Sequence, residues 1–297
     1  MLACHPIFIS PLPASASLLQ SPPPVADIPH MRRHVLPALL VAAAAAGCGR
    51  SPTSQRPIDP PARTGRPRLW STIAMLQALC WPCRAGAAWK LLPALYPPRQ
   101  TIGSRLERWV EHDVLARALA VLDGCLRLAR GRKRQPSAGI LDTQSVKAGP
   151  QRGPRGFDAG KKVRGRKRVL LVDTLGLVHV IQLVPASVQD RDTPVVLEPE
   201  LAGSTLLKLW ADLAFNGEAP TASVIRCGID LELVGRKGKV GFQVEPKRWR
   251  LEQTFGVLGR YRRLLVDHEG STTMSRTMTL LAALFMTANR FEREAMA

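Results

Sequence analysis

The hydrophobic pattern of the chain divides it into three stretches. Residues 1–64 mix apolar, small and proline residues without a regular period, which predicts a disordered leader. From Trp70 to about Arg130, apolar positions recur every three or four residues, as expected for helices, and we assign residues 65–134 to a helical domain. The repeat is clearest at four leucines: Leu115, Leu119, Leu122 and Leu126. Prolines interrupt the helices at three positions: Pro93, Pro97 and Pro98.

The pattern changes to that of β-strands after a basic linker at residues 130–134. Short apolar runs predict strands at residues 139–142, 168–173, 177–184 and 206–210. The second and third of these runs are joined at Thr174-Leu175-Gly176, a hairpin signal. Helical periodicity returns at residues 247–265 and 274–291. We therefore predict an α/β domain at residues 135–297, with helices packed on a mixed sheet.

Charge indicates the kind of partner that the chain binds. Its 297 residues include 42 Lys and Arg against 23 Asp and Glu, for a formal net charge of +19. Such a balance predicts a polyanionic partner. The positive charge recurs in blocks from residue 63 to residue 263, and this favours DNA over a membrane surface. The helical stretch at residues 65–134 then fits a DNA-binding domain of the helix-turn-helix kind, although periodicity alone fits a plain packing domain nearly as well.

Several classes of protein lack support in the sequence. The six cysteines are scattered, unlike those of a small disulfide-stapled domain. Cys80 and Cys83 have the spacing of a redox motif, but they lie in a helix-like stretch without a βαβ pattern around it. The six histidines show no metal-ligand spacing, and no phosphate-binding glycine loop or nucleophile elbow is present. An ATP-driven or acyl-transfer enzyme is therefore not expected.

Residues 31–48 resemble the signal of an exported lipoprotein. A basic start is followed by an apolar run and by the sequence AAGC at residues 45–48. The segment begins thirty residues into the chain and precedes a basic, DNA-binding pattern. We therefore interpret it as spurious and expect a cytoplasmic, nucleoid-associated protein, with export as the alternative.

Three acidic residues have the positions needed for metal-dependent cleavage of DNA. Asp142 and Asp212 each end or follow an apolar strand, and Glu252 lies on a helix. Carboxylates are the ligands that Mg²⁺ prefers, and two such ions can activate a nucleophile and stabilise the leaving oxygen. The pattern alone does not rank these residues above two rival acids, Asp173 and Asp190.

A series of motifs resembles the IS5-type branch of the IS4/IS5 insertion-sequence transposases. The motifs, in chain order, are LDTQSVK at 141–147, RGFDAGKKVRGRKR at 155–168, LVDTLG at 171–176, VQDRD at 188–192, WAD at 210–212, PKRW at 246–249, EQTF at 252–255 and LGRYRR at 258–263. Upstream, GRPR at 65–68 and RAGAAW at 84–89 resemble the helical N-terminal domain of the same family. The similarity covers roughly residues 65–291.

The resemblance implies an RNase H-like catalytic fold with the three acids of a DDE site. Asp142 would be the first acid, Asp212 the second and Glu252 the third, holding two Mg²⁺ or Mn²⁺ ions. The implied activity is a DNA transposase that cuts strands at the ends of an insertion sequence and joins them to target DNA. The family also implies a homo-oligomer assembled on DNA.

Positively charged residues near these motifs are predicted to bind DNA phosphates. The stretch from Arg152 to Arg168 contains eight Lys or Arg and a single acid, Asp158. Six of its cations are predicted contacts: Lys161, Lys162, Arg164, Arg166, Lys167 and Arg168. The family signature adds Arg248, four residues before Glu252, and Arg260. The alternatives are an ordinary solvated loop for the basic stretch and an i,i+4 ion pair between Arg248 and Glu252.

The chain departs from the family pattern at two places that affect activity. Residues 213–215 read LAF where the family usually has a Gly-Gly-Tyr-like turn, and the usual first residues are replaced by the leader. Glycine permits backbone conformations that other residues avoid, so its loss here affects how Asp212 is aimed. The alternative function is therefore a catalytically inactive, decayed or fused remnant that still binds DNA.

Overall fold

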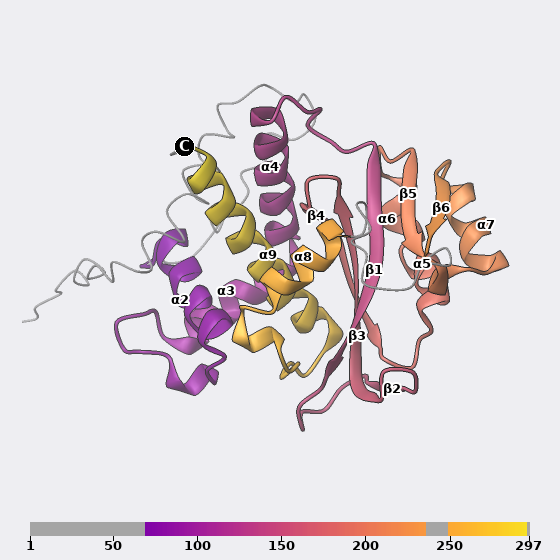
Figure 1. The fold of residues 1–297 in the computed structure, drawn as a ribbon. Helices are drawn as coiled ribbons and strands as arrows, with labels where there is room; N and C mark the ends of the chain where they lie inside the picture. Colours follow the sequence, from indigo (N-terminus) through magenta and orange to yellow (C-terminus); the bar gives the residue numbers. More distant parts are fainter. Residues whose placement is uncertain (1–68, 236–248, 296–297) are drawn as a thin grey trace, which may run out of the picture.

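The computed structural model describes residues 69–235 and 249–295, and at its centre is a six-stranded mixed sheet (Figure 1). The strands are β1 (Ala138–Lys147), β2 (Gly156–Asp158), β3 (Val163–Asp173), β4 (Val178–Pro185), β5 (Lys208–Asp212) and β6 (Asp230–Val234). β3 pairs antiparallel with β1, β2 and β4, whereas β5 and β6 extend the sheet from β1 in parallel. This mixed sheet, with helices on both faces, confirms the predicted RNase H-like α/β fold.

The central strand β3 is buried on both faces, which explains its continuous apolar run. Leu170 and Val172 belong to one hydrophobic cluster, and Val169 and Leu171 belong to the other. Side chains alternate between the two faces of a strand, so a strand between two layers of helices has no solvent-facing side. The pattern of residues 168–173 therefore predicted a strand correctly.

Two layers of helices cover the sheet (Figure 1). On one face lie α2 (Thr72–Ala85), α3 (Arg99–Glu111), α4 (Val114–Ala129), α8 (Trp249–Leu258) and α9 (Thr272–Ala295). The opposite face carries α5 (Thr193–Val196), α6 (Glu198–Ala202) and α7 (Glu218–Arg226). The described part of the chain also contains four short 3₁₀ turns: η1 (Trp89–Leu91), η2 (Asp190–Asp192), η3 (Leu213–Phe215) and η4 (Arg262–Leu264). None of the helices in the described ranges is long and apolar enough to cross a membrane.

The helical stretch before β1 shares its core with the sheet. One hydrophobic cluster includes Leu79 of α2, Leu122 of α4, Leu170 of β3 and Phe285 of α9. The buried guanidinium of Arg127 on α4 also pairs with the carboxylate at the end of β3. Within the described residues, the predicted boundary at residue 134 therefore does not separate two hydrophobic cores. The division of the chain into domains at 65–134 and 135–297 remains a prediction.

The predicted helical pattern at 70–130 and the helix predicted at 274–291 are confirmed. Of the helix predicted at 247–265, the described part forms α8, which ends at Leu258 and is followed by η4. The antiparallel hairpin formed by β3 and β4 is also confirmed. β1 and β3 are longer than predicted because their polar halves pair with each other, from Thr143 opposite Val169 to Lys147 opposite Gly165. Hydrophobic runs could not indicate these polar halves. The leader at 1–64, the signal-like segment at 31–48 and Arg248 lie outside the described residues.

Candidate active site

The pairing of β1 with β5 places two of the predicted acids next to each other. These strands run parallel, with Leu141 opposite Ala211. Asp142 and Asp212 are the next residue on each strand, so they lie side by side across strands that are about 4.8 Å apart. Residues 70 positions apart in the chain therefore meet at one point of the sheet.

Both carboxylates point to the face of the sheet that α8 and α9 cover. Leu141 and Ala211 are buried in the cluster beneath α5–α7. Successive side chains of a strand point to opposite faces, so Asp142 and Asp212 point the other way. Trp210, two residues before Asp212, packs against the cluster that includes α8 and α9, in agreement with this assignment.

A local hydrogen bond orients Asp142, and a closed turn follows Asp212. The amide of Thr143 donates a hydrogen bond to Oδ1 of Asp142 at 2.7 Å, and both aspartates are half-buried. Asp212 has extended backbone angles, with φ −69° and ψ 161°, and is followed directly by η3. The amide of Asn216 closes this turn on the carbonyl of Leu213 at 3.0 Å.

The sequence LAF after Asp212 forms its turn without a glycine conformation. Residues with positive φ occur elsewhere in the described ranges, and none of residues 213–215 is among them. A Cβ added at Gly235 would overlap the side chain of Leu213, so this leucine packs on the end of β6. The backbone leaves β5 here without requiring glycine at these three positions.

Glu252 lies in the first turn of α8, on the same side of the sheet as the two aspartates. Leu251 and Leu258 anchor α8 in the core. Thr254 Oγ1 donates a hydrogen bond to the carbonyl of Gly176 at 3.1 Å, so the helix also rests on the β3–β4 turn. The side chain of Glu252 is exposed. Among residues 69–235 and 249–295, no three His, Cys, Asp or Glu side chains are gathered closely enough to hold a metal ion.

Asp173, the first rival acid, has a structural position. It is completely buried, pairs with Arg127 and accepts hydrogen bonds from the amides of Leu175 and Leu177, both at 2.8 Å. Burial alone would raise the pKa of this carboxyl, but contacts with His179, the amide of Leu177 and Arg127 lower it below its usual value. Asp173 therefore holds the β3–β4 turn against α4.

Asp190, the second rival, lies on the opposite face of the sheet from Asp142. Its Oδ1 accepts hydrogen bonds from Lys167 Nζ at 2.6 Å and from Thr143 Oγ1 at 2.7 Å. Burial opposes ionisation of this carboxyl, and the hydrogen bonds from Lys167 and Thr143 bring its pKa below the usual value. Thr143 points away from Asp142 because the two are consecutive on β1.

The predicted DNA-binding cations divide into exposed and buried groups. Lys161, Lys162, Arg164 and Arg260 are exposed. Arg166, Lys167 and Arg168 are only 2 to 3% exposed, and each is engaged by protein atoms. The prediction that these three bind DNA is not supported by their placement, because their charges point into the protein.

The partners of the buried cations show what these residues do. Arg166 donates to the carboxylate of Asp267 at 3.0 Å and to the carbonyl of Glu269 at 2.8 Å. Arg168 donates to Leu264 O at 2.6 Å and to Gln144 Oε1 at 3.2 Å. Both therefore tie the segment after α8 to the sheet.

The Gln144–Arg168 contact lies beside the two aspartates and was not identified from the sequence. Gln144 is two residues after Asp142 and shares its face of β1. Arg168 lies opposite Gln144 in the register. Burial lowers the pKa of Arg168 to about 10. The available signal was a single polar residue, Gln144, two positions after Asp142, and this does not reveal its partner.

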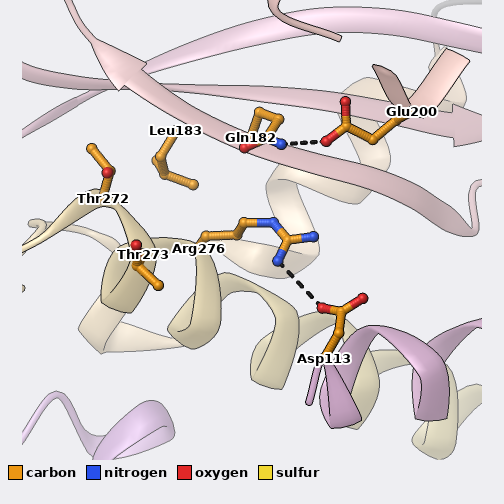
Figure 2. Close-up of a pocket in the computed structure, with 7 residues that line it drawn as sticks. All are labelled: Asp113, Gln182, Leu183, Glu200, Thr272, Thr273 and Arg276. Carbon is orange, nitrogen blue, oxygen red and sulfur yellow. Dashed lines mark hydrogen bonds and ion pairs between the residues drawn. The ribbon is translucent and has the colours of Figure 1, made fainter. Parts of the chain in front are cut away.

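A pocket of about 400 Å³ opens elsewhere, between β4, α6 and the start of α9, and Figure 2 shows its lining. None of the predicted site residues lines it. Its polar groups contact each other: Arg276 lies 3.6 Å from Asp113, and Gln182 donates to Glu200. The pocket is therefore separate from the aspartate pair.

Cys80 and Cys83 are buried in α2 and are not bonded to each other. Burial raises the pKa of the Cys80 thiol to about 12 and raises that of Cys83 as well. A reactive cysteine needs an accessible thiolate. The placement of this pair therefore gives no support to a redox role.

Two family models match the chain. Residues 54–119 match the model described as "Putative transposase of IS4/5 family", and residues 133–226 match the model described as "Transposase DDE domain". The chain belongs to the IS4/IS5-type DDE transposases. Asp142 and Asp212 fall within the matched DDE domain, whereas Glu252 lies beyond its last matched residue. A search of curated proteins finds no match.

Proposed function

We propose that this transposase chain cuts and rejoins DNA, with Asp142 and Asp212 at the centre of its active site and Glu252 as the third acid. The observation that carries the proposal is the parallel register of β1 and β5, which brings the two aspartates together on one face. The matched DDE domain, which contains both, supports it further.

The donor set fits a divalent cation. Asp142 and Asp212 supply adjacent carboxylate oxygens, which are the hard ligands that Mg²⁺ and Mn²⁺ prefer. Glu252 lies on the helix that covers the same face, and it would join them by a movement of its exposed side chain or of α8. When bound, one or two such ions supply Lewis-acid stabilisation of the phosphate oxygens and acidify the attacking water or 3′-hydroxyl.

The protein groups around the aspartates orient the reactants. The Thr143 amide fixes one oxygen of Asp142, and the rigid pairing of β1 and β5 fixes the spacing of the two carboxylates. The exposed cations at Lys161, Lys162, Arg164 and Arg260 would hold the DNA backbone through its phosphates. We propose that the protein acts as a homo-oligomer on paired DNA ends.

The test is cleavage and strand transfer on duplexes that carry the DNA bordering the coding sequence, with Mg²⁺ or Mn²⁺. Asp142→Asn and Asp212→Asn are expected to lower the rate by about a thousandfold or more, because several kcal/mol of charge stabilisation depend on the ligands. Asp192→Asn is the matched control, since Asp192 is exposed and makes no cap hydrogen bond. Wild-type rates in both aspartate variants would refute the assignment.

The cleavage rate of the Glu252→Gln variant is interpreted separately. A loss equal to that of the aspartate variants would identify Glu252 as the third acid. A wild-type rate in Glu252→Gln, together with inactive aspartate variants, would reject Glu252 alone and leave the aspartate pair in place.

A second candidate function is DNA binding without cleavage. The lack of a three-acid group among the described residues favours it. Salt-dependent binding of the bordering DNA, with no cleavage by the wild-type chain in either metal, would establish this function and exclude the first.

A further inference from the structure

The β2–β3 hairpin exposes an aromatic side chain among positive charges. Phe157 is 56% exposed and lies opposite Arg164 in the register. Lys161 and Lys162 occupy the turn of the hairpin, and both are exposed. An exposed aromatic ring beside cations combines a face on which bases can stack with charges that attract phosphates.

The hairpin is held rigidly rather than being a flexible loop. At its base, Gly156 pairs with Gly165, and a Cβ on either residue would overlap neighbouring atoms. At its tip, Asp158 accepts hydrogen bonds from the amide of Lys161 at 3.0 Å and from Ser145 Oγ at 2.6 Å. The single acid of the stretch is therefore occupied inside the hairpin, and Phe157 is presented in a fixed position.

Phe157 lies on the same face of the sheet as the paired aspartates. Arg164 and Leu170 are an even number of residues apart on β3, so they share a face, and Leu170 lies opposite Asp142. Directly opposed residues of neighbouring strands also share a face, which places Phe157 there with Arg164. At about 3.3 Å per residue, Arg164 lies roughly 20 Å along β3 from the level of Asp142.

The segment after α8 covers the face of the sheet between the level of the aspartates and the hairpin. The segment after α8 runs along this face, with the carbonyl of Leu264 over Arg168 and the carboxylate of Asp267 on Arg166. On this segment, Arg260 and Arg262 are exposed.

We propose that Phe157 stacks on a base of the bound DNA, at a point where the duplex is opened or distorted, while Arg164 and Lys162 contact the adjacent phosphates. Aromatic rings bind bases through their π-faces with little sequence preference, and flanking cations track the backbone. The inference rests on the proposed function only in taking DNA as the substrate. With about 3.4 Å per nucleotide, the stacked base would lie roughly six nucleotides from the cleaved phosphate.

The first test compares the affinity of full-length variants for a forked DNA duplex over a range of salt concentrations. Phe157→Ala is expected to weaken binding about tenfold without changing the salt dependence, since it removes stacking and no charge. Phe157→Trp should restore the affinity. Arg164→Gln should instead reduce the slope of log affinity against log salt by about one unit, the signature of a lost phosphate contact.

Leu207→Ala is the control for the loss of an exposed apolar side chain, because Leu207 is 68% exposed and lies outside the hairpin. It should bind like the wild type. Equal affinity in Phe157→Ala and wild type would overturn the proposal. A change of oligomeric state in Phe157→Ala without a change in DNA affinity would also overturn the proposal, because the ring would then contact a second copy of the chain. Thermal unfolding of each variant checks that the fold is retained.

The second test locates the contact by photocrosslinking, with 5-iodouracil placed in turn at each position of the forked duplex. The expected crosslink joins Phe157 to one or two neighbouring positions, and it disappears in Phe157→Ala. Crosslinks confined to Trp249 or to other aromatic residues would overturn the proposal. Neither test depends on cleavage, so an inactive wild type with a Phe157 crosslink would reject the proposed activity and retain the stacking contact.

Discussion

Replacing Arg127 by methionine tests whether the helical stretch and the sheet unfold as one unit. Arg127 on α4 and Asp173 at the end of β3 form an ion pair in which the side chains are 7% and 0% exposed. Methionine retains most of the apolar length of arginine and removes the charge. Asp173 would then be a buried carboxylate held only by its turn amides and by His179, whose Nε2 lies 3.8 Å away.

Removing one partner of a buried ion pair costs about 3–5 kcal/mol. We expect the lower end, about 3 kcal/mol, because two backbone amides still donate to Asp173 at 2.8 Å. Asp173→Asn should cost a similar amount, since it leaves the Arg127 guanidinium buried with Lys133 O as its remaining partner at 2.8 Å. The double variant has no unpaired charge, so its loss should be smaller than the sum by about 2 kcal/mol.

The assay is urea unfolding of the four proteins, followed by both tryptophan fluorescence and circular dichroism. The matched control is Arg130→Met, because Arg130 pairs with Glu294 at 2.6 Å with its side chain 46% exposed and should contribute less than about 1 kcal/mol. Additive losses in the double variant would refute the coupling. Two separate transitions in the wild type would refute the single unit.

Three further results are expected. Gly165→Ala should lower the thermal midpoint, because its Cβ would overlap the carbonyl oxygen of Val146 in the β1–β3 ladder. Cys80 and Cys83 should react with alkylating reagents only after denaturation, since burial raises the pKa of both thiols, and mass spectrometry of labelled native protein would reveal the opposite. Asp123→Asn should stabilise the protein at neutral pH, because Asp123 is only 1% exposed, and burial followed by repulsion from Asp173 raises its pKa well above 3.8. A group whose pKa is raised on folding favours the folded state below its unfolded pKa and loses that contribution as pH rises. The gain in unfolding free energy from asparagine should therefore shrink as the pH falls towards 4. A gain that stays constant with pH in unfolding measurements would contradict this assignment.

The candidate site illustrates how far local sequence patterns reach. Asp142, Asp173 and Asp212 each end or follow an apolar run, and the residues around them did not rank these acids above one another or above Asp190. Strand register distinguishes them, since it places Asp142 beside Asp212 and gives Asp173 a partner on a distant helix. The resemblance to the family selected the same two aspartates because it compares long, ordered motifs rather than single positions.

The basic stretch from Arg152 to Arg168 shows where such patterns fail. Eight cations in seventeen residues predict a solvated, phosphate-binding surface, because charged side chains are rarely buried without partners. Here the partners exist, but they lie far away in the chain, as with Arg166 and Asp267. The stretch is therefore half an exposed hairpin and half the buried part of β3.

The sequence by itself determined the helices and strands with strong periodicity, the positive charge and the motifs shared with the family. These properties depend on neighbouring residues, since hydrogen bonding within a helix and alternation within a strand are local. Only the tertiary structure decided which acids meet, which cations remain exposed and that α4 shares a core with β3. Those outcomes depend on the pairing of strands and helices that are distant in the sequence, and pairing is set by the packing of the whole core.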